Sequence, residues 1–470
     1  MTVKQRPTRT EIILYERPIL KGMLLLSLPV FFNNILKSFH DMVDLFFLAR
    51  MPRSDAIISS SIAAINIHFP TYAFFLAIGS GLGVAAVTIV SQYLGSKRPD
   101  LAKNYASKIT LFSLLFGIIV TLMMFFLAPL IVRLMGATGD TFTFAVQYFQ
   151  IRAFEIIPVF LFIVYQSIRQ AEGKTLLPGI INISGIILNA FFTWLFVNKL
   201  DMGVAGAAWS TLIGQSIGLP FVIASLLFSK DNLTINFKEF NIDKRTTIDI
   251  FKLMIPATLA TALNSLGFMI IQSRILSYGN DVSAGYSAGN RISQLVSNSF
   301  AAVSTVLATY IGNNVGNNNP KRARESYWTA LIFITAAATI LSLVFILIRK
   351  QMILILVSAD VSESVLNYAM TFSFWLLIIQ PMVAIMWCDN SYFNGSGHAV
   401  YSFISGTIRL WVIRIPLIYL LEYIFPILSY NSISVAMVIS NIIILILNVF
   451  LKRKITLERT VTFDEEFVGS

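Results

Sequence analysis

The sequence predicts an all-α integral membrane protein with about twelve transmembrane helices in two six-helix lobes related by an internal repeat. Three observations predict this fold. The 470 residues are 56% hydrophobic and only 13% charged, whereas soluble globular domains are about 25% charged. Many apolar stretches reach about 20 residues, the length that crosses a bilayer. Landmarks in the first half of the chain also recur, in the same order, in the second half.

The predicted spans follow the apolar stretches in order. The second and third stretches are joined directly by "GSGLG", so we merge them into one element, which leaves about twelve spans. The stretches are 20–48, 57–81, 82–95, 105–134, 143–169, 177–198, 204–228, 248–277, 283–311, 326–348, 364–393, 399–422 and 432–451.

The internal repeat rests on three pairs of segments. "LLLSLPVFFNNILKSF" and "FKLMIPATLATALNSL" align Pro29 with Pro256, and two further pairs align Gly95 with Gly316 and Gly173 with Gly397. Tandem repeats of this kind are one architecture of secondary transporters. We therefore expect an N-terminal lobe over 1–228, a cytoplasmic linker over 229–246, a C-terminal lobe over 247–454 and a cytoplasmic tail over 455–470.

The net charge of +11 is distributed as a membrane topology signal and not as a nucleic-acid patch. Basic residues cluster in alternate loops, while the intervening loops "GATGDT", "NKLDMG" and "SYGNDVS" are nearly free of them. Because positive loops stay on the cytoplasmic side, both termini should be cytoplasmic and the number of spans even. The basic clusters are Lys4, Arg6 and Arg9; Lys97, Arg98 and Lys103; Arg169 and Lys174; Lys238, Lys244 and Arg245; Lys321, Arg322 and Arg324; and Lys452, Arg453 and Lys454.

The first span carries an unusual polar stripe. Asn33, Lys37, His40 and Asp44 are spaced at i, i+4, i+7 and i+11, so they share one helix face, and Asp41 lies beside it. A carboxylate in the bilayer core costs about 2.5–3.5 kcal/mol even on insertion scales. The stripe should therefore line a cavity or contact polar groups of other spans. The alternative is that the aspartates lie at the headgroup level.

Other spans offer partners for this stripe. Asn182, Asn189 and Thr193 share a face of the fifth span, the sixth contains Ser210 and Thr211, and the fourth contains Tyr148. Carboxylate, amide and hydroxyl oxygens suit Na⁺ or a proton relay. The competing explanation for each amide and hydroxyl is polar packing between helices.

Several other polar residues are weaker candidates. Glu155 stands three residues from Arg152, so the two can neutralise each other, and Asp389 is either a second ionisable site or structural. The single cysteine, Cys388, excludes an internal disulfide, and three histidines argue against a transition-metal site. Three arginines of the C-terminal half, Arg291, Arg409 and Arg414, are expected to pair or to reach the interface.

With these segments in view, the chain resembles the multidrug and toxic compound extrusion (MATE) transporters over essentially its whole length. The likeness rests on an ordered set of segments: "MVDLFFLAR", "IVSQYLGSKRPDLAK", "RQAEGKTLLP", "IILNAFFTWLF", "GVAGAAWSTLIGQ" and "ATYIGNNVGNNNPKRARE". The resemblance implies two lobes around a central cleft that opens alternately to each side. It further implies export of amphipathic cations in exchange for H⁺ or Na⁺.

The resemblance also implies roles for individual residues. The family's first-span aspartate matches Asp44, its fifth-span asparagine Asn189, a sixth-span threonine Thr211 and a fourth-span tyrosine Tyr148. There are departures from the pattern. Thr193 replaces a frequent aspartate and His40 a frequent tyrosine, and the acidic residues that one branch carries in its C-lobe fall here on Asn264 and Ala384. The chain thus looks like the branch whose coupling lies in the N-lobe.

We therefore expect a secondary antiporter and not an enzyme; a flippase for a lipid-linked or amphipathic substrate is the alternative. An intramembrane enzyme would need either a metal or paired catalytic aspartates in two separate spans, and Asp44 and Asp389 are the only conceivable pair. Ion coupling is assigned to Asp44, Asp41, His40, Asn189, Thr193, Thr211 and Tyr148, with Asp44, Asn189 and Thr211 as ligands if the ion is Na⁺. The expected lining of the substrate cavity is Phe39, Met42, Phe154, Phe192 and Met269.

The remaining expectations concern cofactors, partners, oligomeric state and location in the cell. No cofactor is expected beyond the transported H⁺ or Na⁺. The partners should be a small-molecule substrate and the lipid bilayer, with no nucleic acid. We expect a monomer in the plasma (cytoplasmic) membrane.

Overall fold

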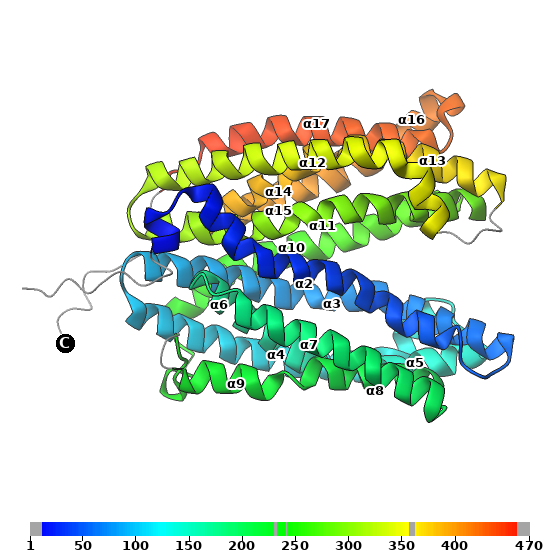
Figure 1. The fold of residues 1–470 in the computed structure, drawn as a ribbon, viewed down its shortest axis with the longest axis horizontal. Coiled ribbons are helices and arrows are strands. Elements are labelled where there is room, and N and C mark those ends of the chain that lie inside the picture. The colour runs from blue at the N-terminus through cyan, green and yellow to red at the C-terminus, as the bar shows by residue number, and fades with distance from the viewer. Residues whose placement is uncertain (1–11, 230–232, 241, 357–361, 458–470) are drawn as a thin grey trace, which may run out of the picture. The chain divides into compact units, whose positions relative to one another are not determined.

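The computed structural model describes residues 12–229, 233–240, 242–356 and 362–457. The side chains of residues 37–42, 237 and 356 also lie outside the described part. Within it every regular element is a helix and there is no strand (Figure 1). This confirms the predicted all-α fold.

Ten of these helices are long and apolar enough to cross a membrane, and two bent helix pairs raise the number to as many as twelve. The N-terminal part comprises η1 (Ile12–Glu16), α2 (Ile19–Leu48), α3 (Asp55–Gly95), α4 (Pro99–Leu134), α5 (Gly139–Ala153), α6 (Ile156–Ala171), α7 (Leu176–Thr193), η2 (Trp194–Lys199), α8 (Gly203–Ser216) and α9 (Leu219–Phe228). The C-terminal part comprises η3 (Phe237–Glu239), α10 (Lys244–Leu276), α11 (Asn280–Gly316), α12 (Pro320–Leu356), α13 (Glu363–Ile378), α14 (Gln380–Gly395), α15 (Ala399–Thr407), η4 (Ile408–Arg414), α16 (Ile415–Ile424), η5 (Pro426–Leu428) and α17 (Asn431–Arg453).

The bends have local causes. The stretch 143–169 forms α5 and α6 with a bend of 45°, and 364–393 forms α13 and α14 with the same angle. Pro158 and Pro381 lie in the first turn of the helix after each bend. Because proline lacks an N–H, it suits a first turn and interrupts a continuous hydrogen-bond ladder. By contrast, 57–81 and 82–95 form the single helix α3, as the merged element predicts.

The chain forms two compact units. One contains residues 28–258, and the other contains residues 1–27 and 259–470. The chain passes from one unit to the other within α2 and within α10, in each case next to the proline of the repeat, Pro29 or Pro256. The expected lobe limits at 228 and 247 differ from this division, because the segment after α9 and the first turns of α10 belong to the unit of residues 28–258.

The two units repeat the same helical details. In each, a bent pair is followed by a span that contains a π-helical turn: η2 ends the span that begins with α7, whereas η4 lies between α15 and α16. Single π-helical turns within helices are uncommon and are frequent at functional sites. The repeat thus extends from sequence landmarks to local backbone geometry.

The segment between α9 and α10 is fixed to its own unit. Lys108 of α4 pairs with Asp243, and Tyr105 donates to Asp249 Oδ2 at 2.8 Å. Arg169 donates to the Leu233 carbonyl at 2.8 Å. Partial burial raises the pKa of Asp243, but hydrogen bonds from Lys108 and Thr246 outweigh it and lower the pKa to about 2.

Candidate functional site

Asp44 is the centre of a buried polar site in the unit of residues 28–258. Its side chain belongs to the last turns of α2 and is 5% exposed. Thr193, at the end of α7, donates to one carboxylate oxygen at 3.0 Å, and Thr211 of α8 donates to the other at 3.0 Å. Three helices therefore meet at one buried carboxylate.

The hydroxyl groups around Asp44 have more acceptors than protons. Thr193 also lies 2.9 Å from the carbonyl of Asn189, and Thr211 lies 3.0 Å from the carbonyl of Ala207. Since a hydroxyl donates one hydrogen at a time, each can serve either the carboxylate or its own helix. Ser210, 2.8 Å from the Thr193 hydroxyl, also reaches the Ala207 carbonyl at 2.8 Å. The donors to Asp44 can thus rotate away when a cation takes their place.

Asn189 completes the site and leaves one acceptor open. Its amide nitrogen donates to Thr211 at 3.2 Å, while its Oδ1 is buried with no hydrogen-bond partner in the described structure. Within the same described part, no lysine, arginine or histidine lies at ion-pair distance from Asp44. A buried carboxylate and an unpaired amide oxygen together form an oxygen-rich site that is short of positive charge, which a proton or a hard cation would supply.

Next to this site lies a buried charged pair. Tyr148 of α5 accepts a hydrogen bond from Arg152 at 2.8 Å, and Arg152 pairs with Glu155 at 2.6 Å. His68 of α3 packs its ring against Tyr148 at 5.0 Å and stacks on Tyr72 at 5.3 Å. Arg152 and Glu155 form a direct ion pair, as the sequence suggests, and the described ion pairs include none between Arg152 and Asp44.

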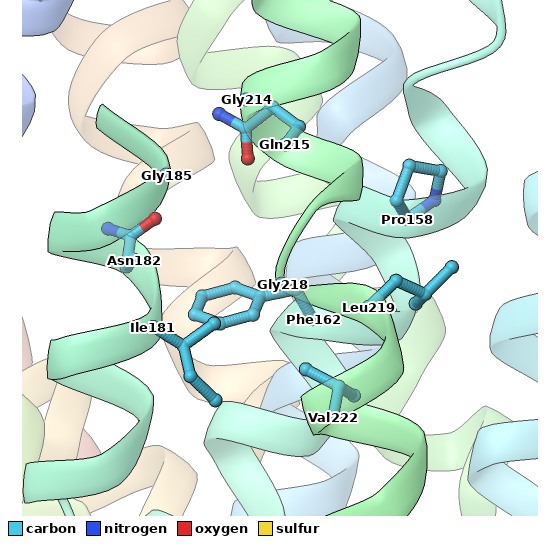
Figure 2. Close-up of a pocket in the computed structure, with 10 residues that line it drawn as sticks. All are labelled: Pro158, Phe162, Ile181, Asn182, Gly185, Gly214, Gln215, Gly218, Leu219 and Val222. Atoms are coloured by element: carbon cyan, nitrogen blue, oxygen red, sulfur yellow. The ribbon is translucent and has the colours of Figure 1, made fainter. Parts of the chain in front are cut away.

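The other end of the polar stripe contacts α7 as well. Asn182 donates to Asn33 of α2. Asn182 and Gln215 also line a narrow cavity of about 10 Å³ between α7 and α8, the space of a single water molecule. Figure 2 shows both amides projecting into this space, with the Phe162 ring below them. The cavity is too small for a drug-sized molecule.

A close approach of α7 and α8 holds the site together. A methyl group added at Gly214 would lie 2.8 Å from Asn189 Cβ and 3.0 Å from the Gly185 carbonyl. Glycine is therefore required at 214 for α8 to bring Thr211 to Asn189. Neither Gly214 nor Gly185 was singled out from the sequence.

The structure brings together only part of the predicted site. Asp44, Asn189, Thr193 and Thr211 are in contact, and Tyr148 packs in the apolar cluster that contains Leu48 of α2 and Ala207 and Ala208 of α8. The side chains of His40 and Asp41 lie outside the described residues. So do those of Lys37, Phe39 and Met42.

The remaining predicted cavity residues do not share the cavity of Figure 2. Phe154 is half exposed at the bend between α5 and α6 and packs against Phe125. Phe192 packs against Phe191 and Phe196, and Met269 of α10 is 40% exposed. Nothing in these contacts defines a substrate cavity.

Sequence reasoning missed His68, which is buried against Tyr148. The only signal was a single histidine inside the apolar run "INIHFPTY". Spacing along α3 does not reveal a partner on α5, because the contact joins positions 80 residues apart.

The other unit contains a second buried carboxylate. Asp389 of α14 accepts hydrogen bonds from Tyr327 at 2.7 Å and Asn448 at 2.9 Å, and pairs with Lys452 at 2.6 Å. Both oxygens are satisfied and the charge is compensated. Asp389 is therefore arranged as a structural ion pair and offers no open ligand.

A multi-pass helical membrane protein made of two repeated halves, with a polar site buried among the helices of one half, has the architecture of secondary transporters. The chain belongs to the MatE family: the family model matches it twice, over residues 29–195 and 256–420. The two matches correspond to the internal repeat and confirm the resemblance seen in the sequence.

The chain is also similar to proteins whose names describe multidrug export or multidrug resistance. The chain is 26% identical over 278 residues to the multidrug export protein MepA of Staphylococcus saprophyticus, an alignment that spans 59% of this chain and 60% of that relative. It is 25% identical over 405 residues to the "Probable multidrug resistance protein YpnP" of Bacillus subtilis, covering 85% of this chain and 87% of that one.

The fold is shared with crystallised transporters. A MATE protein crystallised in complex with MaD3S superposes with a TM-score of 0.87 at 20% identity, covering 95% of this chain and 98% of that one. A MOP superfamily transporter from Pyrococcus furiosus gives a TM-score of 0.88 at 20% identity, with coverage of 96% and 98%.

Proposed function

We propose that this protein is a secondary antiporter that exports amphipathic, mainly cationic molecules in exchange for H⁺ or Na⁺, and that Asp44 binds the exchanged ion. The observation that carries the proposal is the state of Asp44: buried, contacted by two rotatable hydroxyls, next to an unpaired amide oxygen and without a cationic partner in the described residues.

The chemistry of coupling follows from this site. Either ion would neutralise Asp44, and Na⁺ would take oxygen ligands from Asp44, Asn189 and Thr211. Loading and release of the ion require that the Asp44 site bind it more tightly in one access state than in the other. Because ion and drug then bias the same two conformations, the binding of each changes the affinity for the other by the same factor.

The substrate class is supported by the names of relatives, which describe multidrug export. Amphipathic cations gain from contact with aromatic faces by about 0.5–2 kcal/mol per ring. We propose further that both termini are cytoplasmic, because basic residues cluster in alternate loops. We also propose that the protein works as a monomer in the cell membrane, as the family resemblance implies. A flippase is the second candidate. It requires a cationic site for phosphate, and Arg409, which has no ion pair among the described residues, supports this candidate.

Dye uptake into everted membrane vesicles, which corresponds to export from the cell, tests the proposal. The vesicles are energised in turn by a pH gradient and by a Na⁺ gradient, with ATP absent. We expect transport of a cationic dye with one gradient and none without a gradient. Transport that requires ATP, or a substrate-free conductance, would contradict antiport.

A further inference from the structure

We propose that the unit of residues 259–470 contains a binding site for the oxyanion of an amphipathic molecule, a phosphate or carboxylate group, and that Arg409 is its main ligand. The proposal concerns binding, so it does not rest on the proposed antiport.

Arg409 has unusual surroundings for an intramembrane arginine. It lies in the π-helical turn η4, in the middle of the span 399–424. Its recorded contacts are two weak neutral ones: one to the amide oxygen of Asn264 at 3.3 Å and one to the sulfur of Met386 at 3.8 Å. Its Nε is buried without a partner among the described residues. A guanidinium has five N–H donors, so most of its binding capacity is unused.

A second guanidinium lies close by. The π-helical hydrogen-bond pattern joins residues five apart, which places Arg414 one turn from Arg409 on the same side of η4. Arg414 donates to the Ser440 hydroxyl at 2.9 Å and to the Asn441 amide oxygen at 2.7 Å, both neutral groups. This bond fixes the orientation of the Asn441 amide, whose nitrogen is a second buried donor without a partner in the described part of the chain.

The cluster of Arg409, Arg414 and Asn441 therefore contains two cations and two donors, Arg409 Nε and Asn441 Nδ2, without a described partner. It has no described acidic partner. The acidic side chains of this unit that form described ion pairs are engaged elsewhere: Glu422 pairs with Arg274, and Asp389 with Lys452. Uncompensated charges inside a membrane are costly and typically mark functional sites. A phosphate or carboxylate would supply both the charge and the acceptors, and it matches the planar fork of arginine.

The internal repeat shows that these two arginines are present in only one copy. At the offset of 224 residues that aligns Gly173 with Gly397, Arg409 corresponds to Gly185 and Arg414 to Ala190. In the N-terminal copy both positions lie within α7 and carry small, uncharged residues, and the π-helical turn of that copy, η2, follows only at Trp194–Lys199. The guanidiniums are thus an addition to one copy.

Calorimetric titration of the purified full-length protein in an uncharged detergent tests the proposal. The probes are dodecyl phosphate, inorganic phosphate, dihexanoyl phosphatidic acid and dodecyltrimethylammonium. We expect saturable binding of dodecyl phosphate. Arg409→Gln should weaken it about tenfold or more, and Arg409→Lys less, because lysine keeps the charge but not the fork.

Arg324→Gln is the matched control, since it removes an exposed cation from the same unit and should leave the affinity unchanged. Without ligand, Arg409→Gln should unfold at the same temperature as the wild type or higher, because it removes an uncompensated charge. A structural role for Arg409 would lower that temperature.

The probes also identify the source of the oxyanion. Equal binding of phosphatidic acid and dodecyl phosphate would assign a lipid headgroup, and a preference for dodecyl phosphate would assign a single-chain amphiphile. No saturable binding of either amphiphile would overturn the proposal. So would unchanged affinity in Arg409→Gln or equal losses in Arg409→Gln and Arg324→Gln.

Discussion

At the scale of single residues, the site at Asp44 is defined by which oxygens are free to change partners. Thr193 and Thr211 each reach both the carboxylate and a carbonyl of their own helix. Hydroxyls placed in this way can stabilise the empty carboxylate and then release it to an incoming cation. An aspartate in place of Thr193 would instead give the site a second charge and a different ion stoichiometry.

Removing one hydroxyl tests this arrangement. Thr211→Val deletes a donor to Asp44 and the acceptor for Asn189 while keeping the side-chain volume. Since a hydrogen bond to a charged group contributes about 1.5–3 kcal/mol, we expect gradient-driven efflux to fall about tenfold or more. The measurement is the initial rate of dye uptake into everted vesicles, which corresponds to efflux from the cell.

Thr211→Ser should recover most of the rate because it restores the hydroxyl. Thr110→Val is the matched control: its hydroxyl is also buried, but it contacts only the Ala106 carbonyl of its own helix. A wild-type rate in Thr211→Val would show that this hydroxyl has no part in coupling.

The sequence predicted the residues of this site better than their surroundings. Asn189 and Thr193 share a helix face by their spacing of four residues, and the polar Asp44 had to avoid lipid, so their meeting was predictable. The contact of His68 with Tyr148 was not, because it depends on how α3 packs against α5. The exposed position of Phe154 follows from the bend between α5 and α6, which no periodicity indicates.

At the scale of helices, close packing of α7 on α8 positions the polar groups. The prediction is that Gly214→Ala displaces Asn189. Overpacking of this kind costs about 1–3 kcal/mol, so both the unfolding temperature and the efflux rate should fall. Thermal unfolding and vesicle efflux measure the two effects.

Gly179→Ala, on the neighbouring helix α7, provides the control. There the nearest atom to an added methyl group is Pro29 Cβ at 3.4 Å, an ordinary contact. Equal effects of the two substitutions would mean that the Gly214 contact does not hold the site.

The segment after α9 shows a second limit of sequence-based prediction. Its polar composition predicts a linker, but the structure fixes it through Lys108, whose burial is not visible in the sequence. Asp243→Asn should loosen it, because a buried ammonium then loses its counter-charge. We expect faster tryptic cleavage after Lys238, Lys244 and Arg245 at neutral pH.

The same contact gives a pH dependence. The pKa of Asp243 is lowered in the folded protein to about 2, from an ordinary value of 3.8. Its stabilising effect is therefore complete above about pH 4 and is lost as the pH falls towards 2. Acid-protease cleavage of this segment in the wild type should accelerate over that interval and should show little change in Asp243→Asn.

At the scale of the whole molecule, the repeat gives two units of the same helical order but different polar content. One contains the buried carboxylate of Asp44 and the other the guanidinium of Arg409, and neither has an ion-pair partner among the described residues. Sequence landmarks and two matches to one family model predict the shared fold. They do not predict this difference, because it arises at positions where one copy is polar and the other is not.

Orientation in the membrane is also a property of the whole chain. We predict a cytoplasmic position for the segment after α9 because of the loop charges. Lys238→Cys in a Cys388→Ser background places one exposed thiol there. It should react with a membrane-impermeant maleimide in everted vesicles and not in intact cells. Labelling from outside intact cells would contradict the predicted topology.

The central claim is that Asp44 binds the coupling ion, and purified Asp44→Asn protein in liposomes tests it most directly. Asparagine keeps the shape and can still accept from Thr193 and Thr211, but it removes the charge. We expect normal folding, retained drug binding and loss of dye transport under both a pH gradient and a Na⁺ gradient. Transport at a near wild-type rate under either gradient would contradict the claim.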